Sequence, residues 1–593
     1  MIQGCKKVFA MVMSVCLLVA AMGTTAFAEN PQNAAKIGSQ EYATLDEAIL
    51  AANEGETIDL LTDCTTSGIN LTKNLIIKGS EKKETITFTQ CGIAMWKKSL
   101  TFENCNVVMN EIGSTPYTAE WNWMTICSNG NSVLNLINST MTLDGKGFDK
   151  HAIYFGANDV LNLTDSTLAI KNYKQDALEW NGGNGGYNVN LTNSKFISDT
   201  NRSGFTGTFI AKIANSQVDV INSLGNGSNG SHFEIADSTV NFNHNTGHGL
   251  SAGNLTIHHS VVNANGNGAN GIHVTGKLDI DNQATVTIEN NDCSISSKWT
   301  IPGALFIAGE AKIANSTVTI QNNNGSGIYQ KSGFLEVESS AKLTIVKNTA
   351  VKLGFGGGIY VNGTMVLADN VVLYNNHAAT AGDDIYNLCE LVFGDVGSDW
   401  ALDGEPDCEH AIDGWYDDAE DARWNAHAEK DDDLHIVRFS VEGDAMASAL
   451  KAAHGLITYT VTVNYLDKAT GEKIGDSFIT EKARENTVYD VTERNKIAFE
   501  GYDYDSTSGD LLTGTLDGNK VINVYYVETE IIEDSSAPLV GPSSTVSEKT
   551  IPDNELPATG GKTMIPVAGG LMIVSMIGVC IFLTKKRQNN ETM

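Results

Sequence analysis

A short motif that recurs through the middle of the chain constrains its fold more than any other feature. The sequence VLNLINSTMTL at Val133–Leu143 alternates apolar and polar residues, turns at a polar pair and alternates again, and VLNLTDSTLAI repeats it at Val160–Ile170. The second apolar residue of the first segment recurs at Leu136, Leu163, Leu191, Ile213, Ile235, Ile257, Ile280, Ile313 and Val337. A unit repeated every ~20–50 residues cannot bury its apolar side alone, so the pattern predicts a solenoid.

Each repeat contains three short apolar segments separated by polar corners. The first corner is a polar pair, whose first member is Asn138, Asp165, Asn193, Asn215, Asp237, His259, Asn282, Asn315 or Ser339 and whose second is usually serine. A second segment follows, such as TVTI at Thr317–Ile320, and a Gly- and Asn-rich turn leads to a third, such as Gly327-Ile328-Tyr329. Three strands per coil, with no helical period between them, predict a parallel β-helix rather than a propeller or a βαβ array.

The open end of such a solenoid needs a cap, because exposed strand edges recruit other chains. In YATLDEAILAAN, Thr44 and Glu47 form a capping box, and an apolar stripe follows at Leu45, Ala48, Ile49 and Ala52. We therefore expect a short helix over the first coil. Residues 34–395 resemble the right-handed parallel β-helix family of pectate-lyase-like and bacterial surface proteins, which implies an all-β fold with three strands per coil.

Both ends of the chain carry targeting signals. Lys6 and Lys7 precede an apolar run and the small-residue site Ala26-Phe27-Ala28, which predicts a secretory signal peptide over residues 1–28. At the other end, Leu556-Pro557-Ala558-Thr559-Gly560 stands before an apolar stretch at 564–583 and a basic tail. About twenty apolar residues suffice to cross a bilayer.

The LPATG sequence, the apolar span and the basic tail, in this order, resemble the LPXTG cell-wall sorting signal of Gram-positive bacteria over residues 556–593. The resemblance implies that a sortase cleaves between Thr559 and Gly560 and joins Thr559 to peptidoglycan. The membrane would then be a partner only through the span at 564–583 before sorting. A permanent single-span protein with a chance LPATG is the alternative.

Residues 456–528 follow a different pattern. Tyr459–Tyr465 alternates, Ala469-Thr470-Gly471 turns the chain, and Val521–Val527 alternates again, which predicts a small antiparallel-rich β domain. From Val463-Asn464-Tyr465-Leu466-Asp467 to Val524-Tyr525-Tyr526 it resembles the MucBP, or mucin-binding-protein, domain of bacterial surface proteins. Such domains usually recur in tandem and this chain has one, so mucin binding and a spacer role both stay open. Residues 529–555 are a Ser-, Pro- and Thr-rich linker.

The segment at 396–455 is crowded with carboxylates and interrupted by Trp415 and Trp424. We expect a partly helical, solvated segment that caps the last coil. A calcium site is the alternative, but the D-x-D-x-D-G ligand spacing is absent.

Charge and cysteine content restrict the partners. The formal net charge of −32 over 593 residues disfavours nucleic acid and anionic membranes, and it suits cations or neutral partners such as glycans. Outside the two terminal signals the cysteines are Cys64, Cys91, Cys105, Cys127, Cys293, Cys389 and Cys408. This odd set fits either disulfides or buried thiols stacked inside the solenoid.

No catalytic, cofactor or metal constellation emerges from the sequence. His248 in NTGHG and Asp383 in GDD resemble parts of the polygalacturonase site, but they lie several coils apart and in reversed order. The histidines His244, His248, His258, His259 and His273 fall on different corners and strands, so we expect no convergent metal site.

The third segments carry the candidate contact residues. Phe306, Tyr329 and Tyr360 occupy the outward position of successive third strands and would stack about 4.8 Å apart. Such a strip suits the apolar faces of sugar rings, although aromatic residues on neighbouring strands also stabilise a sheet by themselves. The sequence therefore predicts a secreted, peptidoglycan-anchored, adhesin-like protein that contacts mucin or other glycans. The alternatives are a wall-tethered carbohydrate-active enzyme and an inert stalk.

Overall fold

The computed structural model describes residues 33–112, 115, 123–180, 182, 185–293, 303–402, 411–420, 423, 448–454, 458–481, 483–484 and 486–529. The predicted signal peptide, the sorting signal with its span at 564–583, and the linker from residue 530 lie outside these residues. Within the described part of the chain, no helix has the length and apolar character needed to cross a membrane.

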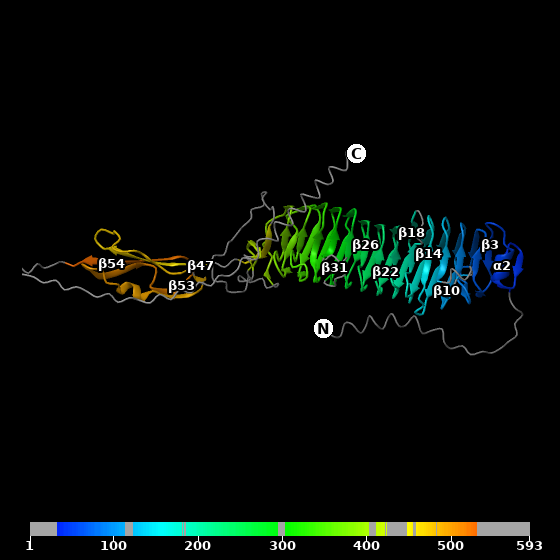
Figure 1. Cartoon of the computed structure of the whole chain (residues 1–593), viewed down its shortest axis with the longest axis horizontal. Helices are drawn as coiled ribbons and strands as arrows, with labels where there is room; N and C mark the ends of the chain where they lie inside the picture. Colours follow the sequence, from blue (N-terminus) through cyan, green and yellow to red (C-terminus); the bar gives the residue numbers. More distant parts are fainter. Residues whose placement is uncertain are drawn as a thin grey trace, which may run out of the picture. The chain divides into compact units, whose positions relative to one another are not determined.

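The described residues between 33 and 402 form a parallel β-helix, in which each coil adds one strand to each of three sides (Figure 1). The first side is a 16-stranded sheet whose opening pairs, β1 with β2 and β1 with β3, are antiparallel. Its strands are, in spatial order, β2 (Gln40–Tyr42), β1 (Ala35–Ile37), β3 (Thr57–Leu60), β6 (Leu75–Lys78), β9 (Ser99–Glu103), β12 (Val133–Ile137), β15 (Val160–Thr164), β18 (Tyr187–Thr192), β21 (Phe209–Ala214), β24 (His232–Ala236), β27 (Asn254–His258), β30 (Leu278–Asp281), β33 (Glu310–Ile313), β36 (Phe334–Val337), β40 (Thr364–Leu367) and β44 (Glu390–Val392).

The second side is a 13-stranded parallel sheet. It contains β4 (Cys64–Thr66), β7 (Thr85–Phe88), β10 (Asn106–Asn110), β13 (Thr140–Asp144), β16 (Thr167–Lys171), β19 (Lys195–Asp199), β22 (Gln217–Ile221), β25 (Thr239–Asn243), β28 (Val261–Asn263), β31 (Thr285–Glu289), β34 (Thr317–Gln321), β37 (Lys342–Val346) and β41 (Val372–Tyr374). A short parallel pair extends this side, because β38 (Thr349–Ala350) follows β37 and β42 (His377–Ala378) follows β41.

The third side consists of two sheets in succession. The first contains β5 (Ile69–Leu71), β8 (Ile93–Met95), β11 (Met124–Ser128), β14 (His151–Phe155), β17 (Leu178–Trp180), β20 (Phe205–Thr206) and β23 (Ser228–Asn229). The second contains β26 (Leu250–Ala252), β29 (Ile272–Val274), β32 (Gly303–Ile307), β35 (Ser326–Gln330), β39 (Ile359–Val361) and β43 (Ile385–Asn387), and is closed by β46 (Ala449–Ala453) and β45 (Gly414–Asp417). The predicted three-stranded coil is confirmed.

Apolar residues of one coil stack directly on those of the next. Ile213 pairs with Ile235, and Ile235 pairs with Ile257, at the inward position of β21, β24 and β27. All three side chains are buried in one continuous hydrophobic core. Alternate residues of these strands point outward, as Ile210 does on β21.

The polar corner after most of the first strands is a left-handed turn, which the recurring Asn and Asp residues favour. Positive φ angles occur at Asn138, Asp165, Asn193, Asn215, Asp237, His259, Asn282 and Asn315. Asn and Asp enter this region more readily than other non-glycine residues. The serines that follow then form a ladder, because each hydroxyl oxygen accepts a bond from the backbone of the coil before it, as Ser166 Oγ does from Ser139 N at 3.0 Å. The next steps run from Ser166 N to Ser194 Oγ, Ser194 N to Ser216 Oγ, Ser216 N to Ser238 Oγ and Ser238 N to Ser260 Oγ.

A second ladder, of buried asparagines, lines the corner after the second strand and was not predicted from the sequence. It contains Asn245, Asn267, Asn291, Asn323, Asn348 and Asn376. The backbone N–H of each residue donates to the side-chain oxygen of the next, as Asn291 N does to Asn323 Oδ1 at 2.9 Å. The side-chain amide also donates to a backbone carbonyl, as Asn323 Nδ2 does to Ile288 O at 3.0 Å. The ladder therefore satisfies corner groups that would otherwise be buried without partners.

The N-terminal cap agrees with the sequence prediction. The helix α2 (Leu45–Ala51) begins at Thr44, whose hydroxyl oxygen accepts a hydrogen bond from Glu47 N at 3.2 Å. Leu45, Ala48 and Ala52 are buried, and Ile49 packs beside them against the core of the β-helix. The helix thus covers the open end of the first coils.

The C-terminal end contains strands that the sequence analysis did not predict. In the segment at 396–455, which was expected to be partly helical, residues 414–417 and 449–453 are β45 and β46, which pair antiparallel with each other. Residues 403–410, 421–422, 424–447 and 455 of this segment lie outside the described residues. β46 also pairs antiparallel with β43, so it ends the parallel sheet. Trp400 and Trp415 are buried, and the indole of Trp415 donates to Gly394 O at 3.0 Å. These tryptophans pack on the last coil together with the buried carboxylate of Asp418, whose Oδ2 accepts a bond from Asp383 N at 2.6 Å.

Residues 458–529 contain separate small sheets, as predicted. One sheet has the order β49 (Phe478–Ile479), β48 (Val461–Asp467), β54 (Lys520–Glu528) and β52 (Tyr502–Gly509). Antiparallel pairs join β47 (Thr458–Tyr459) to β50 (Ala483–Arg484), β48 to β49, and β51 (Val488–Asp490) to β53 (Thr513–Thr515). A 3-10 helix, η3, spans Thr492–Lys496.

The stacked core gives a first prediction. Ile235→Ala should lower the free energy of unfolding by roughly 2–5 kcal/mol, since it removes a buried side chain packed between two coils. Urea denaturation would measure the change. Ile210→Ala, on the outward side of the neighbouring strand, is the matched control and should change stability by less than about 0.5 kcal/mol. Equal effects of the two changes would contradict this strand register.

The end of the asparagine ladder gives a second prediction, on pH. Asp384 Oδ1 accepts bonds from Asn376 N and Nδ2, and Asp384 Oδ2 accepts one from Ala452 N at 2.8 Å. Burial raises the pKa of Asp384 to about 7. As the pH rises, the unfolded chain therefore ionises first, near pH ~4, and the stability that this residue contributes falls until about pH 7.

The free energy of unfolding of the parent, minus that of Asp384→Asn, should accordingly decrease as the pH rises from about 4 to about 7. Unfolding at several pH values, followed by tryptophan emission, would measure it. Neighbouring Asp383 and Asp418 are present in both proteins, so their titration largely cancels from the difference. A difference that stays constant over this range would contradict the prediction.

Candidate functional site

The predicted aromatic strip exists and extends one coil further than expected. On the outward side of β29, β32, β35, β39 and β43, the paired residues are His273, Phe306, Tyr329, Tyr360 and Tyr386. The Tyr329 and Tyr360 ring centroids are 4.6 Å apart with an interplanar angle of 4°. Tyr360 and Tyr386 are 5.6 Å apart at 20°. Five rings thus form one stack along the β-helix, which we call the aromatic ladder.

Phe306 does not fit the predicted contact surface. It points away from the core, but it is only 2% exposed and lies between His273, at a centroid distance of 4.4 Å, and Tyr329. Tyr329, Tyr360 and Tyr386 are partly exposed. The expectation that Phe306 presents a free face is therefore wrong, because neighbouring rings cover both of its faces.

Stacking also changes which parts of the tyrosines a ligand can reach. Nearly parallel rings about one coil apart cover each other's faces, so the ring edges and phenol groups remain. Among the described residues, no hydrogen bond engages the phenol groups of Tyr329, Tyr360 and Tyr386. The ladder thus offers a row of hydroxyl donors and acceptors along an apolar edge, rather than a set of flat platforms.

Tyr386 was missed although the sequence contains its signal. Gly327-Ile328-Tyr329 and Gly358-Ile359-Tyr360 share a pattern that continues at Asp384-Ile385-Tyr386 with aspartate in place of glycine. The aspartate interrupts the Gly-Ile-Tyr pattern in the sequence. In the structure it ends the buried asparagine ladder.

A second group of functional side chains lies on the same side of the β-helix, several coils earlier. His151 is on β14, Asp176 and Glu179 belong to the next coil, and Arg202 to the one after. Glu179 is in register with Tyr154 on β14, at the outward position that leads on to the aromatic ladder. We call these four residues the His–Asp–Glu–Arg cluster. The sequence analysis did not bring these four residues together.

The cluster is tightly connected through Asp176, which is completely buried. Arg202 Nε donates to Asp176 Oδ1 at 2.9 Å, and the second guanidinium nitrogen, Nη2, contacts the other carboxylate oxygen. Arg202 Nη2 also lies 3.9 Å from Glu179 Oε2, and His151 Nδ1 lies 3.7 Å from Asp176 Oδ2. Arg202 therefore contacts the carboxyl groups of both Asp176 and Glu179, and the imidazole of His151 lies next to Asp176.

The environment separates the protonation states of the two carboxyl groups. Burial raises the pKa of Glu179 to about 9, and its contact with Asp176 adds to the shift. Asp176 is desolvated as well, but the interactions of its carboxylate with Glu179 and Arg202 outweigh burial and hold its pKa below the usual value. Burial lowers the pKa of His151. Near neutral pH this arrangement favours a protonated Glu179, an ionised Asp176 and a neutral imidazole.

Several polar atoms here are buried without a hydrogen-bond partner among the described residues. They are His151 Nδ1, Glu179 Oε2, Trp180 Nε1 and Thr206 Oγ1. Leaving a buried donor or acceptor unsatisfied costs ~1–3 kcal/mol each, so their concentration on three neighbouring strands calls for an explanation.

The cluster is not disposed like the carboxylate pair of a glycosidase. Such a pair flanks the scissile bond with one acid and one accessible base or nucleophile. Asp176 has no exposed surface, and Arg202 occupies both of its oxygens. The rings of Trp123 and Tyr154 border the cluster, with their centroids 4.5 Å apart and an interplanar angle of 72°.

The histidines considered from the sequence do not form a common centre. His258 pairs with Asp281, and His259 Nδ1 lies 2.7 Å from Asp237 Oδ1. His248 and His273 do lie side by side, with ring centroids 5.1 Å apart. Burial, followed by repulsion from His248, lowers the pKa of His273 to about 4, so its ring is neutral and extends the aromatic ladder.

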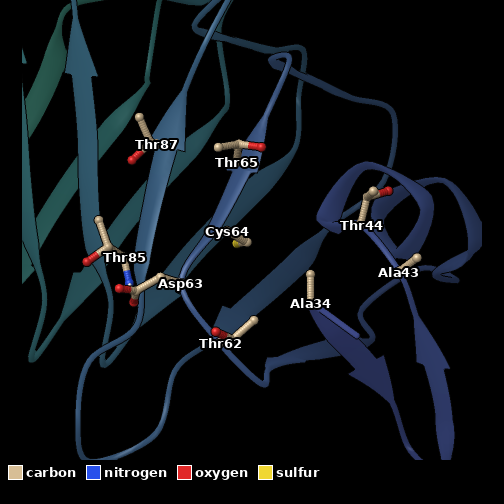
Figure 2. Close-up of a pocket in the computed structure, with 9 residues that line it drawn as sticks. All are labelled: Ala34, Ala43, Thr44, Thr62, Asp63, Cys64, Thr65, Thr85 and Thr87. Atoms are coloured by element: carbon tan, nitrogen blue, oxygen red, sulfur yellow. The ribbon is translucent and has the colours of Figure 1, made fainter. Parts of the chain in front are cut away.

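A pocket of about 470 Å³ lies beside the N-terminal cap (Figure 2). It is lined by Ala34, Ala43, Thr44, Thr62, Asp63, Cys64, Thr65, Thr85 and Thr87. Asp63 Oδ1 already accepts a bond from Thr85 N at 2.7 Å. Burial raises the pKa of the Cys64 thiol to about 11, which leaves little thiolate for nucleophilic chemistry. The pocket therefore offers a polar, threonine-lined depression without an activated group.

The aromatic residues of the predicted MucBP-like motif contribute to packing. Tyr465 and Tyr526 are buried, and both rings contact Phe499, at centroid distances of 5.2 and 5.1 Å. Tyr526 also donates to Ile497 O at 2.7 Å. These two tyrosines therefore stabilise the fold of the region.

Comparison with known proteins assigns no family. No protein-family model matches the chain, and a search of curated proteins found none that matches it.

Proposed function

We propose that this protein is a secreted, peptidoglycan-anchored surface protein whose β-helix binds a glycan along its third side. The terminal signals support export and attachment by a sortase at Leu556-Pro557-Ala558-Thr559-Gly560. The strongly negative charge suits an uncharged glycan, such as a neutral mucin chain, better than an anionic polymer.

The observation that carries the binding proposal is the row of three partly exposed tyrosines. Tyr329, Tyr360 and Tyr386 repeat the same chemical group at nearly constant spacing on one rigid sheet. A repeating polymer can bind such a row through many weak contacts, and the preformed scaffold limits the entropy lost on binding. Phenol groups can exchange hydrogen bonds with sugar hydroxyls while the ring edges cover apolar C–H groups.

The proposal gives a specific test on the phenol groups. Tyr360→Phe with Tyr386→Phe should weaken binding to mucin glycans at least about tenfold, because two hydrogen-bonding groups worth ~1 kcal/mol each disappear while the stack remains. Glycan-array screening would identify a ligand, and titration calorimetry would measure its affinity. Phe334→Ala, which removes an exposed aromatic ring from the first side, is the control and should leave affinity unchanged.

Unchanged affinity of the double phenylalanine variant for the glycan that the parent binds would reject the tyrosine row as the contact. Absence of any glycan binding by the parent would instead favour the inert stalk.

The anchoring part of the proposal is tested separately. Thr559→Ala should abolish covalent attachment to the wall and leave the protein in the membrane or medium, because sortase joins the Thr559 carbonyl to peptidoglycan. Muramidase digestion followed by immunoblotting distinguishes the bound and free forms. Recovery of the variant on peptidoglycan fragments would reject the sorting-signal assignment.

A further inference from the structure

We propose that His151, Asp176 and Glu179 form a binding site for a divalent transition-metal ion such as Zn²⁺. This site is separate from the tyrosine row, and the inference does not depend on glycan binding. It rests on the geometry of three ligating groups, on the atoms left without partners, and on the charge balance of the cluster.

The geometry brings one ligand atom from each residue into a single small volume. A nitrogen of His151 and a carboxylate oxygen of each acidic residue all lie within 4.8 Å of one another. Ligands about 2.0–2.2 Å from a tetrahedral Zn²⁺ are separated by ~3.4 Å, so side-chain shifts of about 1 Å close the site. Among the described residues, this is the one such group of three.

The unpartnered atoms are the ones that a metal ion requires. His151 Nδ1 and Glu179 Oε2 are both buried without a hydrogen-bond partner in the described part of the chain. Each is also the atom of its residue that faces the rest of the cluster, since His151 Nδ1 lies 3.7 Å from Asp176 and Glu179 Oε2 lies 3.9 Å from Arg202. Because these atoms expose almost no surface, the site suits a single ion rather than a larger ligand.

Arg202 supports the site without blocking it. It binds Asp176 through two nitrogens, and each carboxylate oxygen keeps a second lone pair for a metal. Hydrogen bonds of this kind commonly orient the carboxylates that bind metals. A metal ion that binds Glu179 displaces the proton of that carboxyl group. Arg202 then neutralises only one of the two negative charges, and the bound cation compensates the other.

The donor set favours a transition metal over calcium. Ca²⁺ is bound by six to eight oxygen atoms, whereas one imidazole nitrogen with two carboxylates suits Zn²⁺. Three protein ligands leave a fourth position open. The ligands come from strands and corners of two adjacent coils, so the scaffold holds them in place.

The experiment uses the predicted mature chain, residues 29–559, freed of metal by chelation. Calorimetric titration with ZnCl₂ should show one tight site per chain, and titration with CaCl₂ should not. Addition of CoCl₂ should give visible absorption bands of a low-coordinate nitrogen–oxygen site. Glu179→Gln keeps the size of the side chain and should weaken Zn²⁺ at least tenfold, as should His151→Ala.

His232→Ala is the matched control. His232 Nε2 lies 3.0 Å from Glu234 Oε1 in a more exposed pair on the first side, which lacks a third ligand. This change should leave the tight site intact. Circular dichroism checks that each variant is folded, and a Zn²⁺-dependent rise in thermal midpoint should occur in the parent and the control but not in Glu179→Gln. Absence of a tight site in the parent, or unchanged affinity in both cluster variants, would overturn the proposal.

Discussion

The vertical pairing of successive coils is the constraint on which the rest of the β-helix depends. Parallel hydrogen bonds place each residue directly over its counterpart in the next coil, as Ile235 lies between Ile213 and Ile257. A position that is buried in one coil is therefore buried in the next coil as well, and this includes the polar groups at the corners. The serine and asparagine ladders are the consequence, because each side chain satisfies the backbone of a neighbouring coil.

Stacking makes the ends of the structure chemically different from its middle. At the N-terminus the helix α2 places Leu45 and Ala48 over the core. At the C-terminus the asparagine ladder ends on Asp384, whose carboxylate accepts bonds from both Asn376 and Ala452. A carboxylate can accept on both sides where an asparagine side chain has one oxygen, so it joins the last parallel coil to the antiparallel β46.

The same register that builds the core also arranges the outer surface. On the third side it aligns Tyr154 with Glu179 and, further along, Tyr329 with Tyr360 and Tyr386. One line of outward positions therefore carries a polar cluster at one part and the tyrosine row at another. The proposed metal site and the proposed glycan surface thus lie on two successive sheets of the same side of the β-helix, held at fixed positions by the core beneath.

The sequence by itself determined the coil, its three strands, the inward residues and the corners, because a period of two within strands and a repeat between coils are local patterns. It also indicated the capping helix through Thr44 and Glu47. It did not show that Phe306 is covered, that the segment after residue 396 contains strands, or that His151, Asp176, Glu179 and Arg202 meet. Those features depend on how side chains from different coils contact one another. Coil lengths vary, so neighbours in space are separated by unequal numbers of residues, and only the folded structure fixes which of them touch.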